Sequence, residues 1–137
     1  MPKEKIVYVP LAVDILHEGH INIIKTAKKY GNVVVGLLTD KAIAQYKELT
    51  ILNFNEREVL VKNLSYVDKV IAQDNYDYES ILNQIKPDYF VHGDDWKNNV
   101  QANQRSELLK LIKNWKGKVL EFKYTKDISS SKIKKNY

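Results

Sequence analysis

The sequence predicts an α/β fold in which alternating strands and helices build a doubly wound, five-stranded parallel sheet. Short β-branched and aromatic runs alternate with longer segments whose apolar residues recur at helical spacing. One run, residues 33–38, is apolar throughout, as expected of a central parallel strand covered on both faces. The chain has 137 residues, of which 44% are hydrophobic and 28% charged, so we expect a single domain over residues 1–137 with right-handed crossovers.

The first half of the chain begins with a strand at residues 6–9, where isoleucine, valine and tyrosine follow one another. A helix is expected over residues 20–30, with Gly31 as its C-cap, because glycine accepts the left-handed conformation that ends many helices. The strand at 33–38 comes next, and a short helix is expected over 41–46. The apolar face of the first helix is formed by Ile21, Ile23, Ile24 and Ala27.

The second half of the chain repeats the pattern. Asn55 is the expected N-cap of the next helix, and Pro87 ends a later one because a proline disfavours helix at the residue before it. The triple serine at 129–131 is expected to cap a short terminal helix. Strands are expected at 67–72, 88–92 and 118–124, and helices over 56–64, 78–85, 103–115 and 132–135.

Composition narrows the classes of function. No cysteine is present, which excludes disulfide scaffolds, cysteine-ligated zinc and thiol catalysis. No apolar run approaches the ~20 residues of a membrane helix, and the N-terminus carries no signal-peptide core, so we expect a cytoplasmic protein without a membrane partner. The net charge of +5 suits an anionic ligand, whether nucleic acid, a nucleotide or a phosphorylated metabolite, although the scattered lysines are also typical of a solvated surface.

Unusual residues gather where the predicted strands end. In a doubly wound sheet, ligands bind beyond the carboxyl ends of the strands, near the point where the strand order reverses. Segments 10–20, 92–96 and 124–131 follow the first, fourth and fifth strands. They are rich in histidine, aspartate, serine and glycine, and the first two hold all three histidines of the chain, His17, His20 and His92.

The segment from His17 to His20 lies at the start of the first predicted helix, where free backbone amides and the helix dipole favour an anion. Two imidazoles three residues apart share one side of a helical turn and could donate hydrogen bonds to one phosphate chain. Gly19 would let a ligand approach the backbone. Two alternatives remain: a metal site with His92 as third ligand, or two ordinary surface histidines.

Other polar residues have both functional and ordinary interpretations. The segment Asp94-Asp95-Trp96 has two interpretations. The functional one is recognition of Mg²⁺ or a nucleotide sugar, and the ordinary one is an aspartate-rich turn with a buried tryptophan. Serines at a capped helix start also suit a phosphate. Lys47 and Arg57 flank the second crossover, and each alone is interpreted as a solvated charge.

Three motifs together resemble a known family. The segment from Asp14 to His20 resembles the D-x-x-H-x-G-H signature of nucleotidyltransferases. Together with Gly93-Asp94-Asp95-Trp96 and the segment 128–133, it is similar to small cytidylyltransferases of the glycerol-3-phosphate cytidylyltransferase type, over nearly the whole chain. The resemblance implies a Rossmann-like fold, CTP as nucleotide, Mg²⁺ as cofactor and a homodimer.

The chain departs from the glycerol-phosphate enzymes in its details. Their Gly-Thr-Phe-Asp opening is Leu11-Ala12-Val13-Asp14 here, and the arginine and glycine of their Arg-Thr-x-Gly-Ile-Ser motif are absent from 124–129. Tyr46 and Asp74 stand near positions of expected lysines. The opening Ala12-Val13-Asp14 and the segment 91–96 are more similar to those of the cytidylyltransferases associated with phosphoenolpyruvate mutase and phosphonate biosynthesis. This resemblance implies a phosphonate acceptor such as 2-aminoethylphosphonate, whose ammonium group would suit Asp74.

The resemblance also implies roles for individual residues. An acceptor oxyanion would attack the α-phosphorus of CTP in line, assisted by His17, His20 and Lys47, with Asp94 near the metal and Tyr46, Lys47 and Asp74 at the acceptor. Alternatives are a glycerol 3-phosphate or other phosphate acceptor, and a nucleotide-binding regulatory module without turnover. We expect no nucleic-acid partner, because the motifs lie at a small-molecule cleft. The implied nucleotide-binding residues are Leu11, Ala12, Asp14, His17, Gly19, His20, His92, Asp94, Trp96, Tyr124, Thr125, Ile128, Ser129, Ser130 and Ser131.

Overall fold

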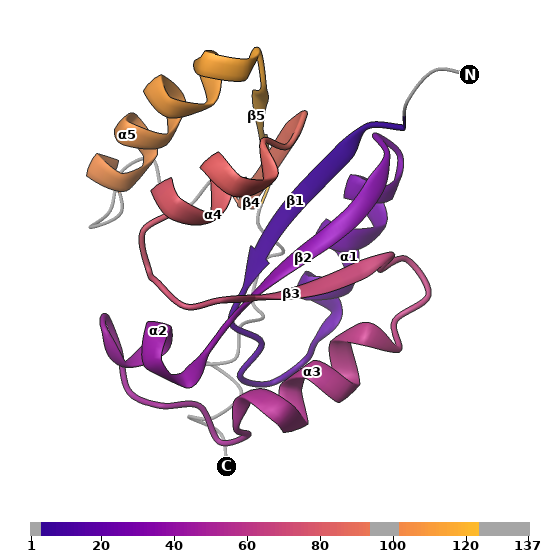
Figure 1. Cartoon of the computed structure of the whole chain (residues 1–137). Helices are drawn as coiled ribbons and strands as arrows, with labels where there is room; N and C mark the ends of the chain where they lie inside the picture. The colour runs from indigo at the N-terminus through magenta and orange to yellow at the C-terminus, as the bar shows by residue number, and fades with distance from the viewer. Residues whose placement is uncertain (1–3, 94–101, 124–137) are drawn as a thin grey trace.

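A computed structural model describes residues 4–93 and 102–123 and has the predicted α/β architecture (Figure 1). Its five strands form one sheet in the order β3-β2-β1-β4-β5, and every neighbouring pair is parallel. The order reverses between β1 and β4, which makes the carboxyl ends of these strands the expected ligand side. The strands are β1 (Ile6–Leu11), β2 (Asn32–Leu38), β3 (Lys69–Gln73), β4 (Tyr89–Gly93) and β5 (Lys118–Phe122).

Helices cover the sheet in two layers, each with its own apolar core. Ile24 and Ala27 of α1 and Val61 of α3 are buried in one core, and Leu82 of α4 and Leu108 of α5 are buried in the other. Figure 1 shows α4 and α5 on one side of the sheet and α1 behind it. The described helices are α1 (Glu18–Lys28), α2 (Asp40–Ala44), α3 (Phe54–Lys62), α4 (Glu79–Ile85) and α5 (Ala102–Ile112), the last continued by the 3₁₀ turn η2 (Lys113–Trp115).

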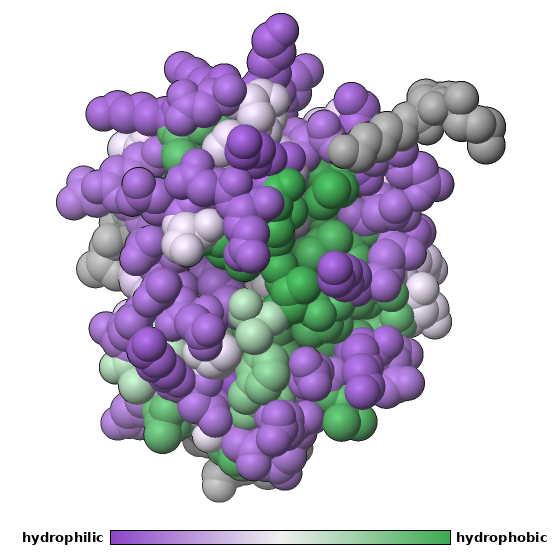
Figure 2. Space-filling model, in the orientation of Figure 1, coloured by the Kyte–Doolittle hydropathy of each residue, from purple (hydrophilic) through white to green (hydrophobic). Residues whose placement is uncertain are grey.

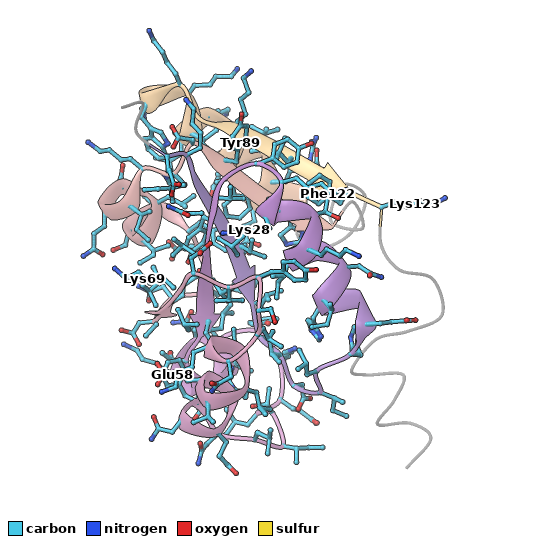
Figure 3. The ribbon with its side chains drawn as sticks, turned by 90° about the vertical axis from the view of Figure 1, so that its right-hand side faces the viewer. Lys28, Glu58, Lys69, Tyr89, Phe122 and Lys123 are labelled. Carbon is cyan, nitrogen blue, oxygen red and sulfur yellow. The ribbon has the colours of Figure 1, made fainter. Side chains whose placement is uncertain are left out.

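Aromatic residues close the core at the C-terminal end of α1. The ring of Tyr30 lies 5.3 Å from that of Tyr89 on β4 and 6.1 Å from that of Phe122 on β5. Tyr89 and Phe122 are labelled in Figure 3, where both lie on the strands beside α1. This contact fixes the far end of α1 and thereby the direction in which its N-terminus points.

Tyr8 makes a contact that spans a whole strand. Its hydroxyl donates a hydrogen bond to the Oε1 atom of Gln73, so the phenol extends from β1 across β2 to β3. Gly36 of β2 lies beneath it, and a Cβ atom at this position would lie 1.8 Å from the Tyr8 oxygen. Position 36 therefore has room only for glycine while Tyr8 keeps this pose.

Two predicted helix ends are wrong by two residues each. The C-cap of α1 is Lys29 rather than Gly31, and Gly31 instead takes a φ of 156° at a point where a Cβ would lie 2.3 Å from the carbonyl oxygen of Lys5. The N-cap of α3 is Asn53 rather than Asn55. Its side chain accepts from the N–H of Glu56, whose carboxylate accepts from the N–H of Asn53.

The remaining boundaries differ modestly from those expected. Strand β3 begins at Lys69, and α1 begins at Glu18 because His17 is its N-cap. The predicted terminal helix over 132–135 lies outside the described residues. No helix in the described ranges is both long and apolar enough to cross a membrane. Figure 2 shows polar surface around an apolar area in the middle of the face that it presents.

Candidate functional site

The site begins at the N-terminus of α1, where both histidines bind backbone amides. The Nδ1 atom of His17 accepts the N–H of Gly19 at 3.0 Å, which makes His17 the N-cap. The Nδ1 atom of His20 accepts the N–H of His17 at 3.2 Å, so the two imidazoles form a reciprocal capping box. The ring centroids lie 4.0 Å apart. The fold therefore brings the two predicted histidines together at the ligand side of the sheet.

These hydrogen bonds determine which nitrogen of each ring carries the proton. A neutral imidazole has one acceptor nitrogen and one donor nitrogen, and Nδ1 is the acceptor in both rings, so both protons lie on Nε2. Burial lowers the pKa of His17. Burial, assisted by His17 and Lys47, lowers the pKa of His20 to about 4. Both rings are thus neutral near pH 7 and present Nε2–H donors beside the positive end of the α1 dipole.

Lys47 lies near His20, and Tyr46 lies beside Lys47. The charge of Lys47 contributes to the low pKa of His20, which places the ammonium group near that ring. The Lys47 Nζ atom also lies 5.4 Å from the centroid of the Tyr46 ring, and that ring stacks on Tyr76 at 4.2 Å. Burial raises the pKa of Tyr46 to about 12, so it remains a neutral phenol. Of the predicted acceptor residues, Lys47 therefore lies near His20, and Tyr46 lies beside Lys47.

Arg57 is buried, and its interpretation as a solvated charge is wrong. It is 0% exposed, and its guanidinium group donates four hydrogen bonds. The acceptors are the carbonyl oxygens of Ala12 (2.6 Å), Leu38 (2.8 Å) and Leu52 (3.2 Å) and the carboxylate of Asp40 (2.9 Å). Arg57 thus joins the loops that follow β1 and β2 to the start of α3. Arg57 precedes the buried Val61 by four residues, so the two share one face of α3.

Asp14 completes this junction from the other side. It is buried, and its Oδ1 atom accepts the N–H of Ile51 at 2.9 Å. Arg57 holds the carbonyl groups of Ala12 and Leu52. The segment that carries Lys47 is therefore fastened to the loop that carries His17. Asp14 serves here as a structural anchor, and its predicted contact with the nucleotide stays a prediction.

Between these two anchors the backbone is strained. Val13 has a φ of 56°, a left-handed conformation that is unfavourable for a β-branched residue. Such strain costs roughly 1–3 kcal/mol and persists only where the surroundings impose it. Here the neighbours Ala12 and Asp14 are both held by hydrogen bonds, and the Val13 side chain is buried in the core. The strained turn directs the chain from β1 toward the histidine pair.

The other predicted residues take several positions. Leu11 is the last residue of β1, and His92 is half-buried on the neighbouring β4, its Nδ1 atom 2.9 Å from the carbonyl oxygen of Gly93. Asp74 is exposed just after β3. The remaining predicted residues lie outside the described residues: Asp94, Trp96, Tyr124, Thr125, Ile128, Ser129, Ser130 and Ser131.

The described residues, 4–93 and 102–123, do not form a metal site built from protein ligands alone. They contain no group of three or more histidine, aspartate or glutamate side chains arranged to hold an ion. The alternative of a metal site built from His17, His20 and His92 is therefore disfavoured. Mg²⁺ commonly binds one or two carboxylates together with substrate phosphates, a mode that needs no such group.

The fold is that of a nucleotidyltransferase-type α/β domain. The chain belongs to the cytidylyltransferase-like family, whose model matches residues 13–136. It is also similar to a solved structure described as the lipopolysaccharide core biosynthesis protein of Thermoplasma volcanium, with a TM-score of 0.76 and 27% identity over 90% of this chain and 99% of that one.

Curated relatives include cytidylyltransferases with different acceptors. The chain is 33% identical over 87 residues to glycerol-3-phosphate cytidylyltransferase of Bacillus subtilis, covering 61% of this chain and 67% of the relative. It is also 33% identical over 95 residues to ethanolamine-phosphate cytidylyltransferase of Arabidopsis thaliana, covering 65% of this chain and 23% of the relative. The chain spans about a quarter of the length of the larger relatives that it matches.

Proposed function

We propose that this protein transfers CMP from CTP to a small phosphonate, such as 2-aminoethylphosphonate, and releases pyrophosphate. The observation that carries the proposal is the pair of neutral imidazoles at the N-terminus of α1, each with Nδ1 bound to a backbone amide and its proton on Nε2. Two fixed donors at a helix N-terminus suit a phosphate chain, and membership of the cytidylyltransferase-like family supports CTP as its source.

The chemistry is an in-line displacement at phosphorus. An acceptor oxygen forms a bond to the α-phosphorus of CTP, and the bond from that phosphorus to the α–β bridging oxygen breaks. The acceptor is already ionised near pH 7, so no strong general base is needed. The protein's part is to align the reactants and to stabilise charge on the phosphoryl oxygens and the leaving group. His17 and His20 donate through Nε2–H, and Lys47 neutralises charge on the triphosphate or the acceptor.

The family resemblance supports Mg²⁺ as a companion of the triphosphate, where it would neutralise phosphate charge. We propose that it binds mainly substrate phosphates, with Asp94 as the candidate protein ligand. The resemblance also supports a homodimer. Light scattering of the purified chain would then give twice the monomer mass of 16.0 kDa.

Two features support an acceptor that carries an ammonium group. Asp74 is exposed at the end of β3, on the loop whose Tyr76 stacks on Tyr46. One relative is an ethanolamine-phosphate cytidylyltransferase, whose acceptor also has an amino group. A partly exposed charge pair contributes only ~0.2–1 kcal/mol, so Asp74→Lys should shift acceptor preference modestly. The second candidate is glycerol 3-phosphate, favoured by the Bacillus subtilis relative.

The values of kcat/KM for 2-aminoethylphosphonate and glycerol 3-phosphate, measured with saturating CTP, test the acceptor. We expect the phosphonate to give the higher value. A higher value with glycerol 3-phosphate would assign the chain to the phosphate-acceptor branch. Unchanged selectivity in Asp74→Lys would remove the electrostatic explanation and leave the measured preference standing.

A further inference from the structure

Three glutamines from three elements hold the loop 74–78 that connects β3 to α4. Gln73, the last residue of β3, donates from Nε2 to the carbonyl oxygen of Asn75 at 2.9 Å. Gln45, the C-cap of α2, accepts the N–H of Tyr76 on Oε1 at 2.7 Å. Gln104 of α5 donates from Nε2 to the carbonyl oxygen of Tyr76 at 2.7 Å. Two adjacent peptide groups of the loop are thus fixed from three directions, an arrangement that we term the glutamine clamp.

The amides of Gln73 and Gln104 each have a determined orientation. Gln73 is 1% exposed, and its Oε1 atom accepts the hydroxyl proton of Tyr8, so only its Nε2 atom can reach Asn75. Burial raises the pKa of Tyr8 well above its ordinary value, which keeps this phenol a donor. Gln104 leaves its buried Oε1 atom without a hydrogen-bond partner among the described residues. An unpaired buried acceptor is unfavourable. Gln104 keeps this position nevertheless, and the hydrogen bond from its Nε2 atom to Tyr76 is the favourable contact that it makes there.

The clamped loop carries the ring that supports Tyr46. Tyr76 stacks on Tyr46 at 4.2 Å, and the Lys47 Nζ atom lies 5.4 Å from the centroid of the Tyr46 ring. Lys47 in turn lies near His20. A shift of the loop would withdraw the Tyr76 ring from Tyr46 and so remove the support that holds the Tyr46 ring and the Lys47 side chain beside the histidine pair. The histidines themselves would not move, because backbone amides of α1 hold them.

We propose that Gln45, Gln73 and Gln104 are positioning residues of the acceptor site, which fix Tyr76 and through it Tyr46 and Lys47. The proposal rests on the proposed function, since it assigns the clamp to the acceptor rather than to CTP. None of the three glutamines needs to touch a substrate. The clamp acts on binding of the acceptor, whereas the α1 histidines act on the phosphate chain.

The test compares Gln104→Leu and Tyr8→Phe with Gln84→Leu, which makes the same type of change at an exposed position on α4. Loss of one hydrogen bond corresponds to about a three- to tenfold effect. We expect KM for the acceptor to rise by this factor in Gln104→Leu and Tyr8→Phe, with KM for CTP unchanged and Gln84→Leu equal to wild type. Tyr8→Phe removes only a hydroxyl group and keeps the test available if Gln104→Leu fails to fold.

A readout independent of turnover separates this proposal from the proposed function. If Lys47 moves away from His20 in Gln104→Leu, the His20 pKa, followed by NMR, should rise above its wild-type value. For a chain that turns over, an unchanged acceptor KM in both folded variants overturns the clamp. If the protein shows no turnover with CTP and any acceptor, the proposed function is wrong. The clamp is then tested by the His20 titration alone, and an unchanged His20 pKa in folded Gln104→Leu would overturn it.

Discussion

The rings of His17 and His20 lie 4.0 Å apart, and each directs its Nδ1 atom to a backbone N–H of the same helical turn. The backbone therefore fixes the tautomer of both rings. Neither ring needs to be charged to bind a phosphate, because each presents a neutral Nε2–H. Since burial lowers both pKa values, the site keeps this state across the neutral range.

The first prediction concerns the position of the donor on His20. The amide nitrogen of Gln reaches roughly the place of Nε2, whereas the shorter Asn side chain reaches only the place of Nδ1. His20→Ala and His20→Asn should lower kcat by about 10²–10³, the usual effect of losing one preorganised donor. His20→Gln should retain more activity than either. Steady-state kinetics on folded variants checks this order, and equal kcat values for Gln and Asn would contradict the Nε2 assignment.

A second prediction concerns stability against pH in the free protein. His20 has a pKa of about 4 in the folded state, while an unfolded histidine titrates near its ordinary value of 6.5. The unfolded chain therefore binds the proton first, and the free energy of unfolding should fall as the pH drops from about 6.5 to about 4. His17 acts in the same direction, whereas Asp68, whose pKa is lowered from 3.8, contributes below this window.

Urea unfolding at pH 7 and at pH 4.5 measures this effect. The loss of stability between the two values should be smaller in His20→Gln, which has no proton to take up at position 20. An equal loss in wild type and variant would show that His20 is not held neutral by the fold.

The buried Arg57 provides a third prediction. Replacement by Met leaves the carbonyl groups of Ala12 and Leu38 without their donor and releases both loops of the site. Each buried acceptor that loses its donor costs about 1–3 kcal/mol, so leaving both carbonyl groups unpaired should cost about 2–6 kcal/mol. Chemical denaturation should show a loss of this size. Arg105→Met is the matched control and should cost less, because Arg105 is 28% exposed where Arg57 is 0% exposed and its described contact is the carboxylate of Glu121 rather than three backbone carbonyl groups.

A fourth prediction concerns Gly36. Gly36→Ala would place a methyl group 1.8 Å from the Tyr8 oxygen and 2.2 Å from its Cζ atom, so the ring must leave its position. Overpacking of this kind costs roughly 1–3 kcal/mol or more. Adding Tyr8→Leu should recover part of the loss, because the obstructing ring is gone. Thermal unfolding of the two single variants and the double variant checks this, and simple additivity would contradict the contact.

The order of strands and helices could be predicted from the sequence because short β-branched and aromatic runs, with 33–38 apolar throughout, alternate with segments whose apolar residues recur at helical spacing. Helix ends were harder to predict. Asn53 and Asn55 each precede a glutamate by three residues, so both match a capping box, and local pattern cannot choose between them. The structure selects Asn53, whose helix start also lets the N–H of Phe54 bond to Asp40 at 3.3 Å.

The histidine pair was predictable because its motif is local, but Arg57 was not. Its acceptors come from segments up to 45 residues away, and nothing in the neighbouring sequence indicates that three carbonyl groups converge on it. The clamp had the same difficulty, since Gln104 and Tyr76 are 28 residues apart and meet through a backbone carbonyl group. Every residue has a backbone carbonyl group, so a side chain that binds a distant carbonyl group leaves no recognisable pattern of residue types in the sequence. The pairing of the Tyr46 and Tyr76 rings was missed because the two residues lie far apart in the sequence, on either side of α3 and β3.

Release of pyrophosphate from CTP, compared with ATP, tests the central claim most directly. With 2-aminoethylphosphonate as acceptor, we predict acceptor-dependent release that is faster with CTP than with ATP and falls by about 10²–10³ in folded His20→Ala. Equal rates with CTP and ATP, or an unchanged rate in folded His20→Ala, would contradict the assignment of this site to cytidylyl transfer.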